Sequence, residues 1–400
     1  MSPTLTINLD TGFLHITTEP GRIPLSRLLG FAARISSKRK FLLVSKILGK
    51  HHPVAPRMMS WSYRALARAL LKHSLIGESL WLGMAETATG LGYGVFAAAY
   101  REGVRNSLFI QTTRYHIDGV KRLEFTEAHS HATDFFLYYP DTEERQQQFY
   151  HAQTLVLIDD EISTGKTFLR LIQAYQAINP NLCKVFIVSL VNFANPIDRK
   201  ALETEAGVLV QWVSLRQGCF HFEEHDNPAL AAITVNVLGN GRCKKQLFGW
   251  PGRQGLNAPI TLDSDIVNAL LNFFKPATTS DTLIRPVLIL GSGECNVPAY
   301  LLGRELERHG YKVKVQSTTR SPIHVSNAIT SVIQFEDNYD DQIPNFIYNL
   351  DPSAYQEIIL CHETPLCHAL RTLLDQWHAI SARIDLPAHS THASLHFFRP

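Results

Sequence analysis

Short apolar runs alternate with amphipathic segments along most of the chain. Residues 5–9 and 13–17 flank Asp10-Thr11-Gly12 and predict a hairpin. Further apolar runs predict strands at residues 79–84, 107–112, 155–158, 185–193 and 208–215. Helical spacing of apolar residues predicts helices at 60–72, 167–178 and 197–206. Strands that alternate with helices are typical of a mostly parallel sheet with helices on both faces.

The pattern changes between residues 239 and 286, where glycines and prolines cluster around one short predicted helix at 263–274. Beyond this stretch the alternation restarts, with a strand at 287–290, a helix at 299–309 and strands at 312–317 and 358–361. A chain of 400 residues fits two domains. We therefore predict an α/β domain over residues 1–248 and a second α/β domain, Rossmann-like, over 249–400.

Composition narrows the class of protein. Apolar residues make up 45% of the chain and the net charge is +2, which excludes a disordered, highly charged protein. The six cysteines include no C-x-x-C pair, and the first residues show no signal-peptide pattern, so we expect a cytoplasmic protein. No apolar stretch is long enough to predict a membrane span.

Charge is unevenly distributed along the first domain. Residues 20–77 contain twelve Lys or Arg and no Asp or Glu. Such a stretch indicates a surface for anions, either a phosphorylated small ligand or nucleic acid. The charge pattern alone does not choose between them.

The most informative segment is Leu-Val-Leu-Ile-Asp-Asp-Glu-Ile-Ser-Thr-Gly-Lys-Thr, residues 155–167. Its apolar start predicts a buried parallel strand, and its acids stand at the carboxyl end, where open α/β sheets bind ligands. The Ser/Thr/Gly loop that follows opens into a helix and suits a phosphate. The adjacent carboxylates suit the hydroxyls of a sugar that carries this phosphate. The segment is no Walker A motif, because Asp160 occupies the position of its first glycine.

Two upstream segments extend the predicted site. A strand ending near residue 84 leads into a loop of small residues, which permits close backbone approach to a diphosphate. Residues 112–135 are polar and irregular, and they predict a functional loop. Within it, Glu127, His129 and His131 offer acid–base groups near neutral pH.

The segment at 155–167 resembles the phosphoribosyl-diphosphate (PRPP) motif of type I phosphoribosyltransferases. The resemblance implies that Asp159 and Asp160 hold the ribose hydroxyls and, through PRPP, Mg²⁺. It further implies a 5′-phosphate loop and a diphosphate loop, which comprise Ser163, Thr164, Gly165, Lys166 and Thr167, and Ala85, Glu86, Thr87, Ala88, Thr89 and Gly90. In the family, a mobile loop in the region of 112–135 closes over the substrate.

One position departs from the hypoxanthine–guanine enzymes of that family. Four residues after the first acid of the pair, those enzymes have an acid that handles the proton of the base, whereas this chain has Ser163. A general base, if the reaction needs one, would be Glu161, Glu86 or a loop residue such as His129 or His131. Simple salvage of 6-oxopurines is therefore not the expected activity.

The second predicted domain places polar loops after three of its strands, which predicts one shared pocket. Thr319-Arg320-Ser321-Pro322 also matches the signature of the TRSP domain, which is found fused behind a phosphoribosyltransferase in proteins of bacterial tellurite-resistance (ter) gene clusters. The residues at 45–50, Ser-Lys-Ile-Leu-Gly-Lys, look like the same family. The predicted pocket comprises Gly291, Gly293, Glu294, Thr319, Arg320, Ser321, His362 and Glu363.

The resemblance implies a Mg²⁺-dependent enzyme that transfers phosphoribose from PRPP to a nitrogenous, nucleobase-like acceptor, in the synthesis of a nucleoside-like metabolite. Two alternatives stay open. One is a PRPP- or nucleotide-sensing regulator without turnover, and the other is a nucleic-acid-binding protein that uses the basic stretch at 20–77. A homodimer and the reverse reaction also remain open.

Overall fold

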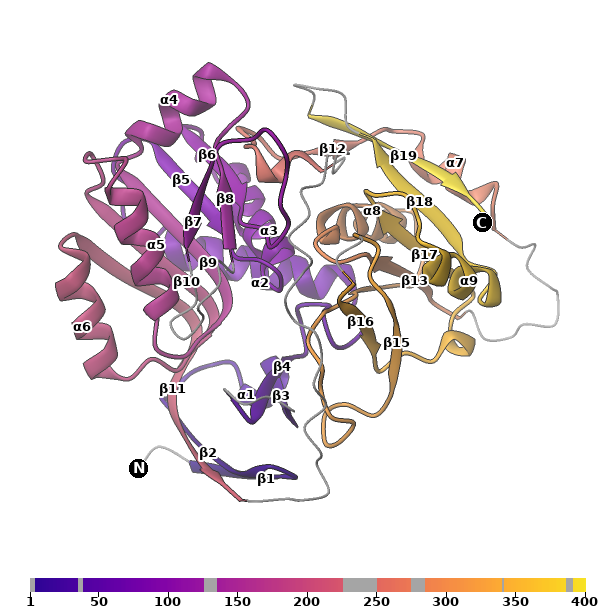
Figure 1. Ribbon diagram of the computed structural model, residues 1–400, viewed down its shortest axis with the longest axis horizontal. Helices are drawn as coiled ribbons and strands as arrows, with labels where there is room; N and C mark the ends of the chain where they lie inside the picture. Colours follow the sequence, from indigo (N-terminus) through magenta and orange to yellow (C-terminus); the bar gives the residue numbers. More distant parts are fainter. Residues whose placement is uncertain are drawn as a thin grey trace. The chain divides into compact units, whose positions relative to one another are not determined.

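The computed structural model describes residues 4–34, 39–125, 135–225, 250–274, 285–339, 342–385 and 391–400. The chain divides into two compact units (Figure 1). The first unit comprises Met1–Leu29, Trp61–Asp226 and Pro251–Pro259, and the second comprises Gly30–Ser60, Asn227–Trp250 and Ile260–Pro400. Neither unit is therefore one continuous segment. Each unit contains residues from both sides of the predicted domain boundary, the cut between residues 248 and 249. The cut itself, at residues 248 and 249, lies outside the described ranges.

A seven-stranded sheet forms the centre of the first unit, in the order β1-β2-β11-β10-β9-β5-β6. Its strands are β1 (Thr4–Leu9), β2 (Gly12–Thr18), β5 (Ser79–Gly83), β6 (Ser107–Gln111), β9 (Thr154–Ile162), β10 (Lys184–Asn192) and β11 (Leu209–Glu224). The five strands from β11 to β6 are parallel, and β1 and β2 form the predicted antiparallel hairpin. β11 is longer than predicted, because its second half leaves β10 and pairs antiparallel with β2.

Helices cover both faces of this sheet, as predicted. The helices that precede β11 in the chain are α1 (Leu25–Leu28), α2 (Pro56–Leu70), α3 (Thr89–Arg101), α4 (Glu143–His151), α5 (Lys166–Gln176) and α6 (Pro196–Ala206). The chain steps outward in one direction from β5 to β6 and in the other direction from β9 to β10 and β11. Right-handed crossovers therefore place α3 on one face and α5 and α6 on the other, as Figure 1 shows. The strand order reverses between β5 and β9.

Capping residues fix several helix boundaries. α6 begins after Asn195, whose side chain accepts a hydrogen bond from the Asp198 backbone N–H, and it ends at Gly207 in the left-handed region. α4 begins after Thr142, which caps the Arg145 N–H in the same way. Both ends of α6 could be read from the sequence, because proline follows its N-cap and glycine follows its last residue.

The stretch at 112–135 is only partly irregular. β7 (Arg122–Phe125) and β8 (Phe135–Tyr138) form an antiparallel ribbon there, where the sequence predicted a loop without structure of its own. Cation–π contacts stabilise the ribbon: Arg114 lies over the Phe135 ring at 4.3 Å and Arg122 over the Phe136 ring at 5.0 Å. The connection between the two strands, residues 126–134, is outside the described ranges.

The second unit is also α/β. Its six-stranded sheet has the order β12-β19-β18-β17-β13-β14. The strands are β12 (Thr261–Leu262), β13 (Val287–Gly291), β14 (Val313–Ser317), β17 (Glu357–His362), β18 (Ile380–Asp385) and β19 (His392–Phe398), and the helices are α7 (Ile266–Leu271), α8 (Asn296–Arg308) and α9 (His368–Gln376). α8 packs against β13, β14 and β17, while Leu370 and Leu374 of α9 join the core formed by Leu288 and Leu360. Two hairpins complete it, β3 (Leu29–Ala33) with β4 (Phe41–Ser45) and β15 (Val332–Glu336) with β16 (Pro344–Tyr348).

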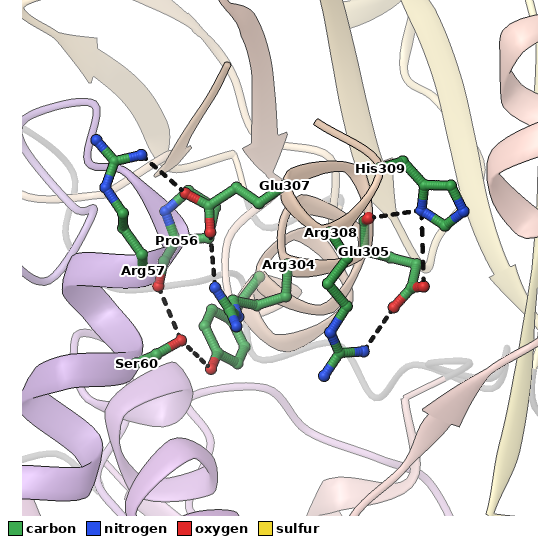
Figure 2. A network of polar contacts seen from close by, with 9 residues as sticks. Pro56, Arg57, Ser60, Arg304, Glu305, Glu307, Arg308 and His309 are labelled. Atoms are coloured by element: carbon green, nitrogen blue, oxygen red, sulfur yellow. Dashed lines mark hydrogen bonds and ion pairs between the residues drawn. The ribbon is translucent and has the colours of Figure 1, made fainter. Parts of the chain in front are cut away.

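The segment Gly30–Ser60 is an integral part of the second unit. Val54 and Val315 exchange both backbone hydrogen bonds, at 2.9 and 2.8 Å. At the start of α2, the Ser60 hydroxyl lies 2.8 Å from the Tyr300 hydroxyl. Figure 2 shows Glu307 of α8 between two guanidinium groups, those of Arg57 at 3.5 Å and Arg304 at 2.7 Å. Apart from the local pair of Arg304 and Glu307, these bonds join residues about 250 positions apart, which no local sequence pattern predicts.

None of the helices in the described ranges combines the length and the apolar character that crossing a membrane requires.

Candidate active site

The acidic pair and the upstream loop meet where the strand order reverses. Asp159 and Asp160 lie near the carboxyl end of β9, within the strand and not after it. The loop after β5 is tied to the same place, because the Met84 N–H donates to the Ile158 carbonyl at 3.0 Å. Ligands of open α/β sheets bind at such a reversal, outside the carboxyl ends of the strands. The structure thus brings together the two segments that the sequence singled out.

Glycines let α3 approach β5 closely at the upstream loop. A Cβ atom on Gly92 would lie 2.4 Å from the Gly83 Cα, a distance that real Cβ atoms do not show. The Ala85 N–H donates to the Thr112 hydroxyl at 2.8 Å, and the peptide bond between Ala85 and Glu86 is cis. Of the predicted diphosphate-loop residues, Ala85, Glu86, Thr87 and Ala88 form the loop, whereas Thr89 and Gly90 begin helix α3.

The predicted 5′-phosphate loop forms the start of α5. Ser163 and Thr164 are exposed, and Gly165 precedes the helix with a left-handed φ of +78°. Lys166 and Thr167 are the first two helical residues, and no acid stands in the first turn. The N-terminal N–H groups and the positive end of the helix dipole suit an anion at this loop.

Asp159 has an unusual electrostatic environment. Desolvation by the surrounding protein raises the pKa of Asp159 well above its ordinary value, and the nearby Asp160 charge raises it further. The Asp160 backbone N–H donates to Asp159 Oδ1 at 2.9 Å and partly offsets this. A ligand that donates hydroxyl hydrogens, or a cation, would lower the energetic cost of the two adjacent charges.

The raised pKa of Asp159 predicts that Asp159→Asn stabilises the protein at neutral and alkaline pH. The folded state holds the proton of Asp159 more tightly than the unfolded state, where the pKa is about 3.9. The contribution that the bound proton of Asp159 makes to the free energy of unfolding is therefore fully present below that value. It is lost as the pH rises through the raised folded-state pKa. Asparagine removes this loss. We expect a higher melting temperature at pH 8, by about 2–4 °C per kcal/mol gained, and no advantage below pH 4.

Thermal unfolding of both proteins across pH 3.5–8.5 measures this effect. The exposed Asp118 provides the matched control, since Asp118→Asn makes the same chemical change in a turn. An Asp159→Asn variant that melts below the wild type at pH 8 would contradict the electrostatic interpretation.

Magnesium suits the donor set at this edge. Carboxylate oxygens are the ligands Mg²⁺ prefers, and it is usually held by one or two carboxylates together with substrate phosphates. Asp159 and Asp160 supply that pair. Across the described ranges, no group of three or more His, Cys, Asp or Glu side chains forms a metal site. A metal at this edge would therefore depend on the substrate for its remaining ligands.

The other predicted catalytic residues are Glu161, His129 and His131, and the structure describes only the first of them. Glu161 lies in β9, opposite Val191 of β10. His129 and His131 fall outside the described residues.

The predicted pocket residues of the second unit lie at the carboxyl ends of the adjacent strands β13, β14 and β17. The Gly293 N–H donates to the Thr318 hydroxyl at 2.8 Å, which joins the loops after β13 and β14. The Tyr339 hydroxyl, from the segment after β15, donates to Glu363 at 2.8 Å. The His362 ring nitrogens lie 2.7 Å from the Thr364 carbonyl and 2.7 Å from the Ser381 hydroxyl. Burial lowers the pKa of His362 and so favours the neutral form of the ring. The remaining residues of this predicted set are Gly291, Glu294, Thr319, Arg320 and Ser321.

Two residues near the first site were missed by the sequence analysis. Thr112 follows β6 and fixes the loop at Ala85. Arg253 is 1% exposed and donates from Nε to the Thr113 hydroxyl at 3.3 Å. Its segment adds to the edge of the sheet, because Leu256 and Phe109 exchange both backbone hydrogen bonds at 2.9 Å. Only the long-range pairing reveals this position, since Arg253 lies beyond the predicted cut.

Family models match both parts of the chain. Residues 28–219 match a model described as phosphoribosyl transferase, and residues 251–377 match the TRSP domain found C-terminal to it. No curated protein matches the chain.

Several solved structures are similar. Adenine phosphoribosyl transferase from Trypanosoma brucei, in complex with AMP, pyrophosphate and ribose-5-phosphate, is 16% identical, with 53% of this chain and 86% of that chain covered and a TM-score of 0.34. The adenine enzyme of Leishmania tarentolae is 17% identical, with 48% and 84% covered and a TM-score of 0.33. Orotate phosphoribosyltransferase of Mycobacterium tuberculosis is 16% identical, with 48% and 91% covered and a TM-score of 0.28.

The two family models follow one another in the order that the TRSP description itself states, and together they span most of the sequence. The chain belongs to the family of phosphoribosyl transferases that carry a C-terminal TRSP domain.

Proposed function

We propose that the protein transfers the 5-phosphoribosyl group of PRPP to a nitrogenous, nucleobase-like acceptor and releases pyrophosphate. One observation carries the proposal: the acidic pair of β9, the small-residue loop after β5 and the N-terminus of α5 meet at the reversal of the strand order. Sugar hydroxyls, a diphosphate and a 5′-phosphate are the three groups of PRPP that such a set would bind.

The chemistry needs little from side chains beyond position and charge. The bond from ribose C1 to the diphosphate oxygen breaks with its electron pair on the diphosphate, and C1 forms a bond to an acceptor nitrogen, which loses a proton. Asp159 and Asp160 would hold the ribose hydroxyls, and the loop at Ala85–Ala88 would hold the leaving group. Positioning of this kind supplies a large part of the barrier reduction in group transfer. Mg²⁺, when bound with PRPP, would neutralise charge on the leaving diphosphate.

The residue at position 163 bears on the chemical class of the acceptor. Ser163 is exposed and carries no charge at the position where the hypoxanthine–guanine enzymes have an acid. Glu161, Glu86 and the histidines His129 and His131 are the candidates for the proton acceptor. We propose that the product is a nucleoside-like metabolite other than a 6-oxopurine nucleotide. The resemblance to proteins of tellurite-resistance gene clusters supports this proposal.

Incubation with PRPP, Mg²⁺ and a cellular metabolite extract tests the proposal. We expect a new ribosyl-phosphate adduct by mass spectrometry and an equimolar release of pyrophosphate. If PRPP raises the melting temperature but no acceptor supports pyrophosphate release, the protein is a sensor without turnover and the proposed activity is wrong.

A further inference from the structure

Two acid-free stretches, far apart in the sequence, meet in the second unit. One is the stretch at 20–77, of which Gly30–Ser60 belongs to this unit. The other runs over residues 308–335, which also contain no Asp or Glu and include Lys312, Lys314 and Arg320. β3 lies directly against the second stretch: Arg34 bridges to Ile323, and the His324 N–H donates to the Ala33 carbonyl at 3.2 Å.

Tyr348 lies at the centre of this junction. Its hydroxyl accepts a hydrogen bond from the Ile323 N–H at 2.9 Å and donates to the Ser321 carbonyl at 2.8 Å. The His51 ring lies 5.9 Å away, with 57° between the ring planes. Burial raises the pKa of Tyr348, and the Arg34 charge opposes this rise. Residues of both acid-free stretches thus lie around the buried ring of Tyr348.

The charges at the junction act on one another. A methyl group on Gly30 would lie 2.9 Å from Ala328 and 3.4 Å from Lys46 Cε, so Lys46 and the second stretch flank the same glycine. Burial lowers the pKa of His52, and the Lys46 charge lowers it further. On the other side, Lys50 is 2% exposed, and its ammonium group donates to the Thr318 carbonyl at 2.8 Å. Cations from the N-terminal stretch therefore flank the Thr-Arg-Ser segment.

Hydroxyl groups at the junction have unused hydrogen-bonding capacity. The Oγ atoms of Ser321 and Ser326 are buried, and neither has a hydrogen-bond partner within the described ranges. Buried hydroxyls normally have partners, so two unmatched hydroxyls within the acid-free stretch at 308–335 point to a ligand that accepts hydrogen bonds.

We propose that Arg34, Lys46, Arg320 and Ser321 form an oxyanion site in the second unit, which takes the phosphate group of a phosphorylated small molecule. Guanidinium, ammonium and hydroxyl groups are the side chains that bind phosphate most favourably. Arg34, Arg320 and Ser321 are half-buried, whereas Lys46 is exposed. The half-buried groups favour a small ligand over nucleic acid, which is contacted by exposed Lys and Arg side chains. The proposal does not depend on the activity of the first unit.

Hydrogen–deuterium exchange of the full-length protein, measured by mass spectrometry, tests this site locally. The probes are AMP, ribose 5-phosphate and adenosine, which lacks the phosphate. We expect AMP and ribose 5-phosphate to slow exchange in peptides covering residues 42–52 and 317–326, while adenosine has no effect there. Protection by AMP and ribose 5-phosphate that is confined to peptides of the first unit, such as 159–167, would overturn the proposal.

Variants then assign the effect to side chains. Arg320→Met keeps the aliphatic stem and removes the charge, and Ser321→Ala removes one hydroxyl. We expect each variant to require at least ten times more AMP for the same protection of residues 317–326. Arg320→Lys should require a smaller increase. Lys312→Met is the control, since the exposed Lys312 lies before the opposite end of β14.

Two results would count against the proposal in this second experiment. One is protection that survives in an Arg320→Met/Ser321→Ala double variant. The other is protection of the same peptides by a single-stranded oligonucleotide at far lower concentration than AMP, which would assign the surface to nucleic acid. Unchanged exchange of the peptides that cover β13 and β17, measured without ligand, shows that the second unit of each variant is folded.

Discussion

Replacing both Asp159 and Asp160 with asparagine is expected to lower PRPP consumption by about 10³-fold or more. The two carboxylates stand where the strand order of the first sheet reverses, beside the loop at Ala85. Asparagine keeps the shape of each side chain but removes the charge that strengthens its hydrogen bonds to ribose hydroxyls and that attracts a metal ion. The change therefore removes positioning and electrostatic stabilisation together.

The measurement is the rate of pyrophosphate release with saturating PRPP and a productive acceptor. The matched control is Glu143→Gln/Glu144→Gln, which removes the same two charges from an adjacent acidic pair in the first turn of α4. That control should retain wild-type activity. If the Asp159→Asn/Asp160→Asn variant consumed PRPP at the wild-type rate, the site assigned to β9 would be wrong.

The candidate site was largely predictable because its chemistry is local in sequence. Strand, acidic pair, glycine and helix start follow one another within residues 155–167, and the sheet merely brings the second loop beside them. Even here the ends of the elements differ slightly from the predicted ones. The strand β9 extends past the two acids, and the helix α5 begins at Lys166, one residue earlier than predicted. Hydrophobic periodicity locates an element well and its ends less well, because the ends depend on hydrogen bonds with neighbouring strands.

What the sequence could not reveal depends on contacts between distant residues. The hydrogen bond from Ala85 to Thr112 and the burial of Arg253 arise only when the edge of the sheet has formed. The exchange of segments between the units has the same origin. The basic stretch at 20–77 could be seen as a composition anomaly, yet its division between the two units followed only from its pairing partners.

Because of this exchange, a fragment of residues 227–400 is expected not to fold cooperatively on its own. It would lack the segment Gly30–Ser60, whose side chains Phe41, Leu43, Val44, Ile47, Leu48 and Val54 are all buried. Burial of six such side chains contributes about 10 kcal/mol, which is comparable to the total stability of about 5–15 kcal/mol for a typical domain. Ala32 and Val44 also complete the core that contains Ile323 and Phe346.

Near-UV circular dichroism and thermal unfolding of three proteins test this expectation. They are the fragment 227–400, the same fragment with residues 30–60 attached through a flexible linker, and a control with the linker and the same 31 residues in scrambled order. Only the second should show fixed aromatic signals and a single cooperative transition, because only it restores the pairing of Val54 with Val315 and the bond from Lys50 to Thr318. A cooperative transition in the fragment 227–400 alone would show that the second unit is stable without the N-terminal segment. A restored transition would show instead that the TRSP domain of this family member is built from two separated parts of the chain.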